Sequence, residues 1–125
     1  MPAAEAAHIE DWLTKRLGLR LKVPDLATEG LRFAGARLLV AAGQPVAQLM
    51  YLPAAGSGAG LVDPRAVGFC YTRTGRPELV PTRRIDDDLY LVEWRQGGYA
   101  FVVLGWQEPD FLARAADAVR AQLET

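Results

Sequence analysis

The chain has 125 residues, of which 50% are hydrophobic and 23% are charged, and its formal net charge is −1. A chain of this length and composition can bury one core, so we expect a single domain over residues 1–125. The balance of 14 basic and 15 acidic residues excludes a protein that attracts nucleic acid through its overall charge. One cysteine, Cys70, and one histidine, His8, exclude an internal disulfide and a conventional Cys/His zinc site.

The first predicted element is a helix over residues 3–17, and Gly18 follows it in the position of a left-handed C-terminal cap. Apolar residues on one face of this helix recur at intervals of three and four, at Ile9, Trp12, Leu13 and Leu17. The longest apolar run, residues 99–106, is much shorter than the roughly 20 residues of a membrane-spanning helix. The N-terminal residues also lack the pattern of a signal peptide, so we expect a soluble chain.

The middle of the chain changes to an alternation of period two, which predicts β-strands. The predicted strands cover residues 31–33 with 35–40, 45–52, 66–72, 88–95 and 99–104. Gly97 and Gly98 separate the last two strands and permit the positive φ angles of a tight hairpin turn.

A second helix is predicted from Pro109, a residue that suits the first helical position. Its apolar stripe contains Leu112, Ala115, Ala116, Val119 and Leu123. The element order predicts an α+β fold, in which an antiparallel sheet of four to five strands is flanked by an N-terminal and a C-terminal helix. Either both helices cover one face of the sheet, or one covers a face and the other covers an end.

Two features could carry chemistry, and the sequence favours a structural role for both. Asp86, Asp87 and Asp88 offer oxygen ligands for Ca²⁺ or Mg²⁺, but they lack the ligand spacing of a calcium loop, so a solvated turn is the better interpretation. Cys70 lies within a predicted strand without a base nearby in the sequence, which favours a buried, inert thiol. We therefore expect no metal, no cofactor and no enzymatic activity.

Aromatic residues on the predicted strands are the best candidates for a binding surface. Each is either a packing residue of the core or part of an exposed patch that contacts a partner. The residues that we predict as wall or anchor groups for a ligand or partner are Tyr51, Tyr71, Trp94 and Tyr99.

Several segments resemble the region outside the membrane in bacterial transmembrane anti-sigma factors, the family of predicted transmembrane transcriptional regulators. The resemblance extends over roughly residues 8–120 and is carried by strand and turn patterns. The matching segments are residues 12–18, 24–26, 30–39, 45–51 and 90–105, followed by a helix with Leu112, Ala115 and Ala116.

The resemblance implies a non-enzymatic sensor or interaction domain on the periplasmic (extracytoplasmic) face of the inner membrane. In such regulators a cytoplasmic segment holds a sigma factor, and a single membrane helix connects it to the sensor. This chain contains neither a His-x₃-Cys-x₂-Cys pattern nor a spanning segment. It would therefore be an excised domain that reaches sigma factor and membrane only through its parent, and whose signal is a protein or a small molecule.

The alternative is a stand-alone α+β protein that binds a small ligand in an apolar pocket between sheet and helix.

Overall fold

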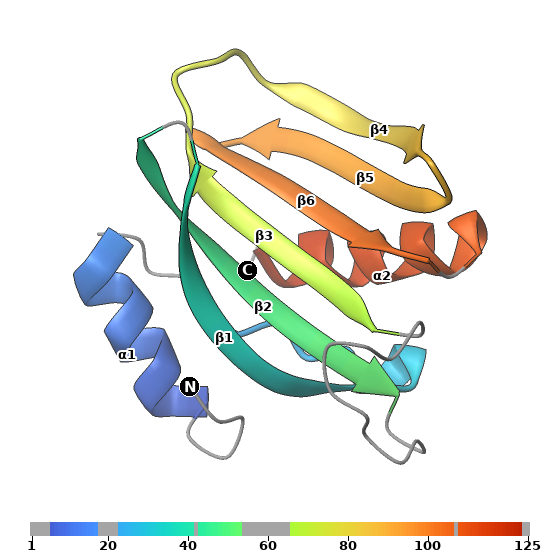
Figure 1. Cartoon of the computed structure of the whole chain (residues 1–125), viewed down its shortest axis with the longest axis horizontal. Helices are drawn as coiled ribbons and strands as arrows, with labels where there is room; N and C mark the ends of the chain where they lie inside the picture. Colours follow the sequence, from blue (N-terminus) through green and yellow to red (C-terminus); the bar gives the residue numbers. More distant parts are fainter. Residues whose placement is uncertain (1–5, 18–22, 42, 54–65, 107, 124–125) are drawn as a thin grey trace.

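The structure is a computed structural model of the whole chain. It describes residues 6–17, 23–41, 43–53, 66–106 and 108–123, without the side chains of residues 6–9 and 16–17. The predicted α+β class is confirmed, because one antiparallel sheet packs with two α-helices (Figure 1). The elements are α1 (Ala6–Leu17), the 3₁₀ helix η2 (Ala27–Glu29), β1 (Leu31–Ala41), β2 (Gln44–Pro53), β3 (Val67–Arg73), β4 (Leu79–Asp86), β5 (Leu89–Gln96), β6 (Tyr99–Gly105) and α2 (Pro109–Leu123).

Within the described residues the sheet has six strands in the order β1-β2-β3-β6-β5-β4, so the predicted count of four to five is wrong. The missed strand is β4, which forms one edge of the sheet and is exposed at every residue after Leu79. A strand with solvent on both faces has no buried side to impose an alternating pattern, and Arg83 and Arg84 stand at its centre. The sequence therefore carries no signal of period two at this strand.

The connection between β3 and β4, residues 74–78, passes across the end of the β5–β6 hairpin. The Thr74 N–H donates to the Gly98 carbonyl at 2.9 Å, and the Arg95 Nε donates to the Pro77 carbonyl at 2.7 Å. Gly97 and Gly98 have φ angles of 61° and 84°, which confirms the predicted tight turn. The connection is thus anchored at two points before the chain enters the edge strand.

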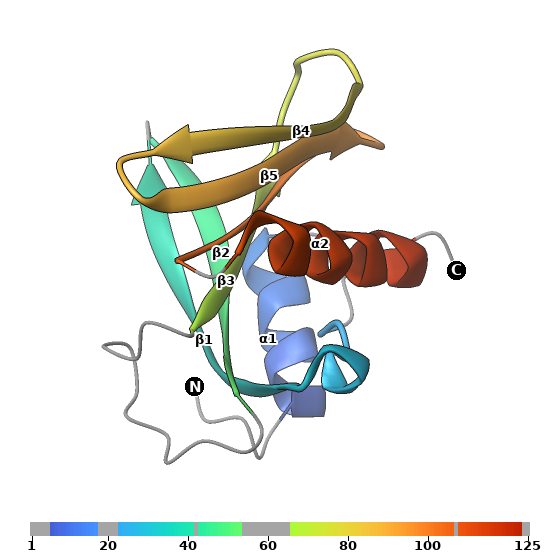
Figure 2. The same ribbon diagram turned by 90° about the vertical axis from the view of Figure 1, so that its right-hand side faces the viewer.

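Both helices lie on one side of the sheet, which twists strongly between β1 and β4 (Figure 2). Figure 1 shows α1 beside the β1 edge of the sheet, so the arrangement in which both helices cover one face stays a prediction. The buried residues of α2 are Leu112, Ala115, Ala116 and Val119, as its stripe predicted. From α1, Leu13 is buried in the same core and Trp12 packs against it. Residues 3–5, Gly18 and the side chains of Ile9 and Leu17 lie outside the described residues.

Short polar contacts connect the N-terminal part of the chain to its neighbours. The Val23 N–H donates to Glu10 Oε2 at 2.6 Å. Gln122 near the end of α2 makes a pair of hydrogen bonds to the backbone of Asp25, as acceptor to its N–H at 2.7 Å and as donor to its carbonyl at 2.8 Å. One amide side chain thus links the segment before η2 to the last turn of α2.

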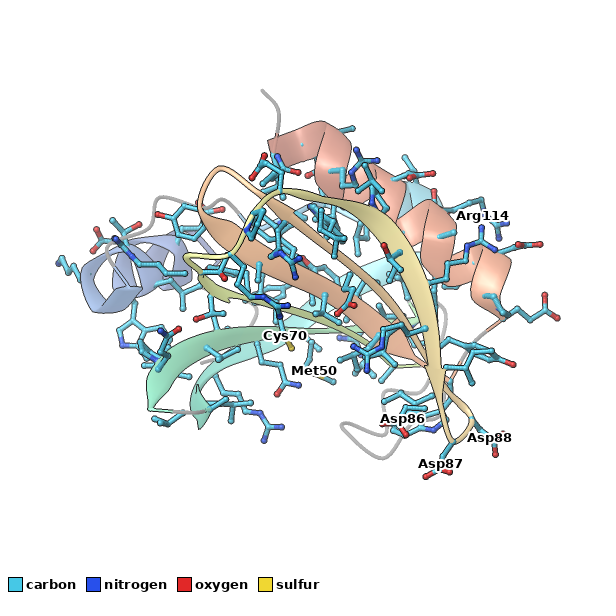
Figure 3. All side chains as sticks on the ribbon, turned by 90° about the horizontal axis from the view of Figure 1, so that it is seen from above. Met50, Cys70, Asp86, Asp87, Asp88 and Arg114 are labelled. Atoms are coloured by element: carbon cyan, nitrogen blue, oxygen red, sulfur yellow. The ribbon has the colours of Figure 1, made fainter. Side chains whose placement is uncertain are left out.

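The opposite face of the sheet carries Met50 and Cys70, away from α2 with its Arg114 (Figure 3). No described helix lies on that face (Figure 2). Among the helices that the structure describes, none has the length and apolar character needed to cross a bilayer.

Candidate functional site

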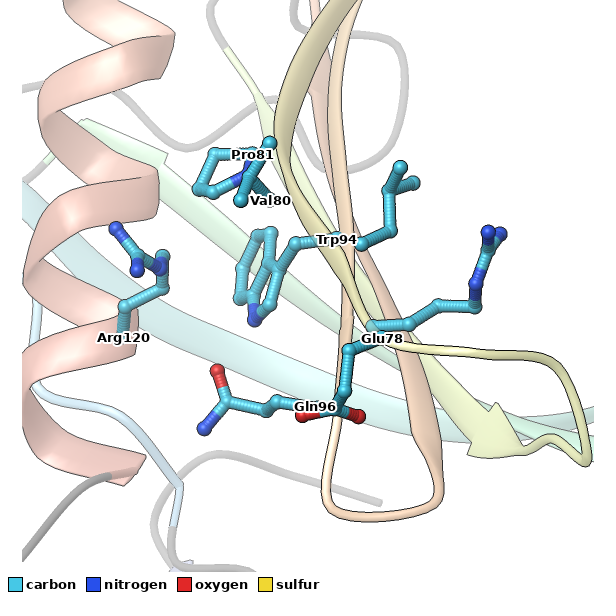
Figure 4. A pocket seen from close by; sticks show the side chains of 8 residues that line it. Glu78, Val80, Pro81, Trp94, Gln96 and Arg120 are labelled. Atoms are coloured by element: carbon cyan, nitrogen blue, oxygen red, sulfur yellow. The ribbon is translucent and has the colours of Figure 1, made fainter.

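A cavity of about 410 Å³ lies between α2 and the paired ends of β4 and β5 (Figure 4). This volume falls within the range of about 300–1,000 Å³ that is typical of small-molecule sites. Its lining includes Glu78, Val80, Pro81, Trp94, Gln96 and Arg120. Three elements therefore contribute to the cavity: the start of the edge strand, the end of β5, and the C-terminal half of α2.

An irregularity in the pairing of β4 with β5 shapes one wall of the cavity. The strands pair Leu79 with Arg95 and then Thr82 with Glu93, so two residues of β4 face the single residue Trp94. Those two residues are Val80 and Pro81, and both lie beside the indole ring (Figure 4). Proline lacks an N–H and is tolerated at such a bulge in an edge strand. The bulge thus gives the cavity an apolar wall.

Trp94 forms the floor of the cavity and is only 1% exposed. Its ring stacks on Phe101 with centroids 5.3 Å apart and on Phe69 at 6.4 Å, which fixes its orientation. Its Nε1–H is buried and has no hydrogen-bond acceptor within the described part of the chain. A buried N–H without an acceptor costs about 1–3 kcal/mol, so most such groups in folded proteins have a partner.

Arg120 faces the indole ring from α2 (Figure 4). Its Nε is also buried and lacks an acceptor among the described residues. Its Nη1 lies 3.8 Å from Asp117 Oδ1, an ion pair one turn away whose carboxylate is 72% exposed. Such an exposed pair is weak, so the guanidinium keeps donor capacity toward the cavity. Two of the residues that line the cavity therefore carry a buried group that can only donate.

Tyr51 and Tyr71, two of the predicted site residues, lie in the core and do not line the cavity. The Tyr51 hydroxyl donates to the Pro24 carbonyl at 2.6 Å. Burial, followed by the nearby Asp25 carboxylate, raises the pKa of the Tyr51 phenol far above its ordinary value. Burial likewise raises the pKa of Tyr71, with a smaller contribution from Glu10, and no described residue accepts its hydroxyl proton.

Tyr99 is half-buried and also lies outside the lining of the cavity. The Arg73 guanidinium carbon is 5.9 Å from the centre of its ring. The Phe101 ring lies 6.4 Å from Tyr99, 6.4 Å from Tyr71 and 5.3 Å from Trp94. The structure thus brings three of the four predicted residues around one phenylalanine, and only Trp94 reaches the cavity.

Sequence reasoning missed the other residues of the cavity, above all Arg120. Arg120 is one of 14 basic residues in the chain, and only the packing of α2 against the sheet brings it to Trp94. Val80 and Pro81 belong to the strand that the sequence did not predict. The hydrophobic pattern of the sequence indicates neither Arg120 nor these two residues of β4 as part of a site.

The acidic cluster forms the predicted turn between β4 and β5, with Asp87 at a φ of 46°. No group of three or more His, Cys, Asp or Glu side chains in the described residues is arranged to hold a metal ion. Cys70 is half-buried on the face away from the helices, where burial raises the pKa of its thiol and a hydrogen bond with Gln48 lowers it by less. Neither feature lies at the cavity.

Comparisons with protein-family models, with curated proteins and with solved structures found no match for this chain. The resemblance to transmembrane anti-sigma factors thus depends on the segments given above, and it stays a prediction.

Proposed function

We propose that this chain is a recognition domain that binds a small molecule in the cavity between α2 and the β4–β5 pair. The observation that carries this proposal is a pair of buried donors, Trp94 Nε1–H and Arg120 Nε–H, which lack acceptors in the described chain and belong to two residues that line one cavity. A ligand that brings acceptor atoms into the cavity removes the cost of both unpaired donors.

The side chains around the cavity favour binding over catalysis. The indole and the guanidinium donate hydrogen bonds and have no basic lone pair at neutral pH. The remaining polar groups of the lining come from Glu78, Gln96 and Arg95, and the Arg95 Nε donates to the Pro77 carbonyl. Cys70 lies on the other face of the sheet, so it cannot serve as a nucleophile there. A nucleophile next to a base is the usual sign of covalent catalysis, and this set of side chains lacks that arrangement.

Binding at this position can act as a signal because the ligand bridges a helix and a sheet. Arg120 belongs to the helix whose Gln122, two residues further on, holds the backbone of Asp25. A ligand that favours the docked position of α2 also favours this link to the N-terminal part of the chain. We propose that the domain uses this coupling as the periplasmic sensor of a membrane-bound anti-sigma factor, where the bound state alters the parent's hold on its sigma factor.

The binding proposal is tested by titrating the ¹⁵N-labelled protein with a set of small acids, amines and neutral compounds. The protein has three tryptophans, so the spectrum contains three indole N–H signals, and the Trp94→Phe variant identifies the signal of Trp94. We expect at least one class of compound to shift the Trp94 signal in a saturable way.

A matched pair of variants on β4 locates the site. Val80→Phe fills the cavity and is expected to abolish the shift, whereas Ile85→Phe adds the same ring to the same strand away from the cavity and leaves it unchanged. The proposal fails if no compound shifts the Trp94 signal, or if the shift survives in Val80→Phe.

The regulatory part of the proposal is tested on the parent gene. A reading frame that continues upstream of Met1 into a membrane helix and a sigma-binding segment supports it, and deletion of this domain should then change the activity of a sigma-dependent reporter. A translation start signal directly before Met1 contradicts it and leaves the stand-alone ligand-binding protein as the function.

A further inference from the structure

We infer that the cavity beside Trp94 selects a small monocarboxylate with an apolar body. This inference rests on the proposed function and adds the chemical class of the ligand. It starts from the two polar groups that are buried at the cavity without partners in the described chain, Trp94 Nε1–H and Arg120 Nε–H.

Both groups require an acceptor, and one of them carries a full positive charge. The guanidinium of an arginine offers donors in a planar fork that matches a carboxylate. A carboxylate has two oxygens and about four lone-pair directions, so it has enough acceptor capacity for both donors. Hydrogen bonds to an ionised acceptor are about twice as strong as neutral ones, which favours the acid over its amide.

The other charged groups of the lining are Arg95, whose Nε already donates to the Pro77 carbonyl, and Glu78, and the carboxylate favours a ligand with one negative charge. Glu78 lies at the cavity together with Gln96 (Figure 4) and disfavours a second anionic group. Asp117 shares the Arg120 guanidinium through Nη1 at 3.8 Å, and this pair leaves the Nε unpaired. A dicarboxylate or a phosphate dianion is therefore a poorer occupant than a monocarboxylate.

The wall of the cavity formed by the start of β4 is apolar, so it favours an acid whose remaining part is apolar. Val80 is 77% exposed although it lies at the cavity beside Pro81 and the indole. A hydrocarbon or aromatic group next to Val80 removes this surface from water, which contributes favourably to binding. The cavity of about 410 Å³ has room for one molecule of this kind.

The test compares acids with matched neutral and basic compounds on the full chain. The probes are benzoate, benzamide and benzylamine, and hexanoate, hexanamide and hexylamine, each titrated while the Trp94 indole signal is followed. We expect the two carboxylates to bind about tenfold or more tightly than their amides.

Four variants separate the effect of charge at the cavity from the effect of charge elsewhere. Arg120→Gln should remove the preference for the acid, and Arg120→Lys, which keeps the charge but lacks the planar fork, should restore part of it. Arg114→Gln removes one charge from the same helix at a residue outside the lining, paired with Glu29 at 3.6 Å, and should keep the preference. Glu78→Gln should tighten binding of the carboxylates and weaken any binding of the amines.

Each result decides the inference separately from the proposed function. Equal binding of acid and amide, or tighter binding of the amines, overturns the carboxylate assignment while small-molecule binding at the cavity stands. A preference for the acid that survives in Arg120→Gln, with a melting temperature like that of the parent chain, also overturns it. If none of the six probes shifts the Trp94 signal, the assignment is wrong, and the wider set of compounds alone decides the proposed function.

Discussion

Tyr51 and Tyr71 are both almost fully buried, and they differ in one hydrogen bond. The Tyr51 hydroxyl donates to the Pro24 carbonyl at 2.6 Å, whereas the Tyr71 hydroxyl has no acceptor among the described residues. Removal of a hydroxyl with a buried partner leaves that partner unpaired, whereas removal of an orphaned hydroxyl relieves a cost. The two residues therefore form an internal comparison of paired and unpaired polar groups.

Tyr51→Phe is expected to lower the free energy of unfolding by about 1–3 kcal/mol, because the Pro24 carbonyl loses its donor in a buried position. Tyr71→Phe is expected to leave the free energy of unfolding unchanged or to raise it. Denaturant unfolding monitored by circular dichroism measures both. An equal loss in the two variants would show that the Tyr71 hydroxyl has a partner.

Stability is expected to fall at alkaline pH through the same two residues. Burial raises the pKa of both phenols above the ordinary value of 10.0. The unfolded chain therefore loses these protons from about pH 10 upward while the folded chain keeps them, so the stabilisation is complete below pH 10 and is lost as pH rises. Each tyrosine contributes a slope of about 1.4 kcal/mol per pH unit above pH 10. Denaturant unfolding between pH 8 and pH 11 measures this slope, and Tyr71→Phe should reduce it; the same slope in that variant would contradict the assignment.

At the level of elements, the contact between α2 and the end of β6 depends on the absence of a side chain at Gly105. A Cβ atom there would lie 3.1 Å from the Ala66 carbonyl oxygen and 3.3 Å from a methyl group of Leu112 in α2. At Gly68, on the opposite face, the nearest atom would be the flexible end of Leu104 at 3.2 Å. A methyl group at Gly105 would thus meet backbone atoms and helix α2. A methyl group at Gly68 would meet a side chain that can move.

Gly105→Ala is expected to lower the free energy of unfolding by about 1–3 kcal/mol, because backbone atoms have to shift to admit the methyl group. Gly68→Ala provides the matched control on the neighbouring strand β3 and is expected to cost clearly less. Thermal and denaturant unfolding of the two variants measure the difference. Equal losses would show that α2 does not pack as closely on Gly105 as described.

The elements that the sequence predicted well are those with one buried face. Strands β2, β3, β5 and β6 alternate because the face that meets the helices is apolar, and Val92 and Trp94 of β5 are buried there as their spacing predicted. β4 was not predicted from the sequence, because an edge strand with Arg83 and Arg84 at its centre is exposed on both faces.

The sequence did not predict the cavity for a different reason. It depends on a bulge at Val80 and Pro81 and on the place where the docked α2 puts Arg120, and both are tertiary features. The aromatic character of Trp94 predicts a site residue, but no sequence pattern indicates that its N–H lacks a partner.

At the level of the whole molecule, the sheet consists of two halves, β1-β2-β3 and β6-β5-β4, that meet where β3 pairs with β6. α2 packs against β5 and β6, and Gln122 connects the end of α2 to Asp25 in the segment before β1. The pair of hydrogen bonds made by one amide side chain thus connects two segments that lie far apart in the sequence.

Gln122→Ala is expected to lower the free energy of unfolding by about 1 kcal/mol, because two hydrogen bonds at an exposed position are lost. The more specific effect is local: the Asp25 N–H, which donates to Gln122, should exchange with solvent faster. The Val23 N–H, which donates to Glu10 at 2.6 Å, serves as the internal control and should keep its protection. Unchanged exchange at Asp25 would contradict the role of this contact.

The partners in this contact are 97 positions apart in the chain. Because a ribosome synthesises residues in order, Asp25 is made before the strands of the sheet. Its hydrogen-bond partner Gln122 is made only with the last turn of α2. A nascent chain stalled before Gln122 therefore lacks the two hydrogen bonds that connect α2 to the segment before β1.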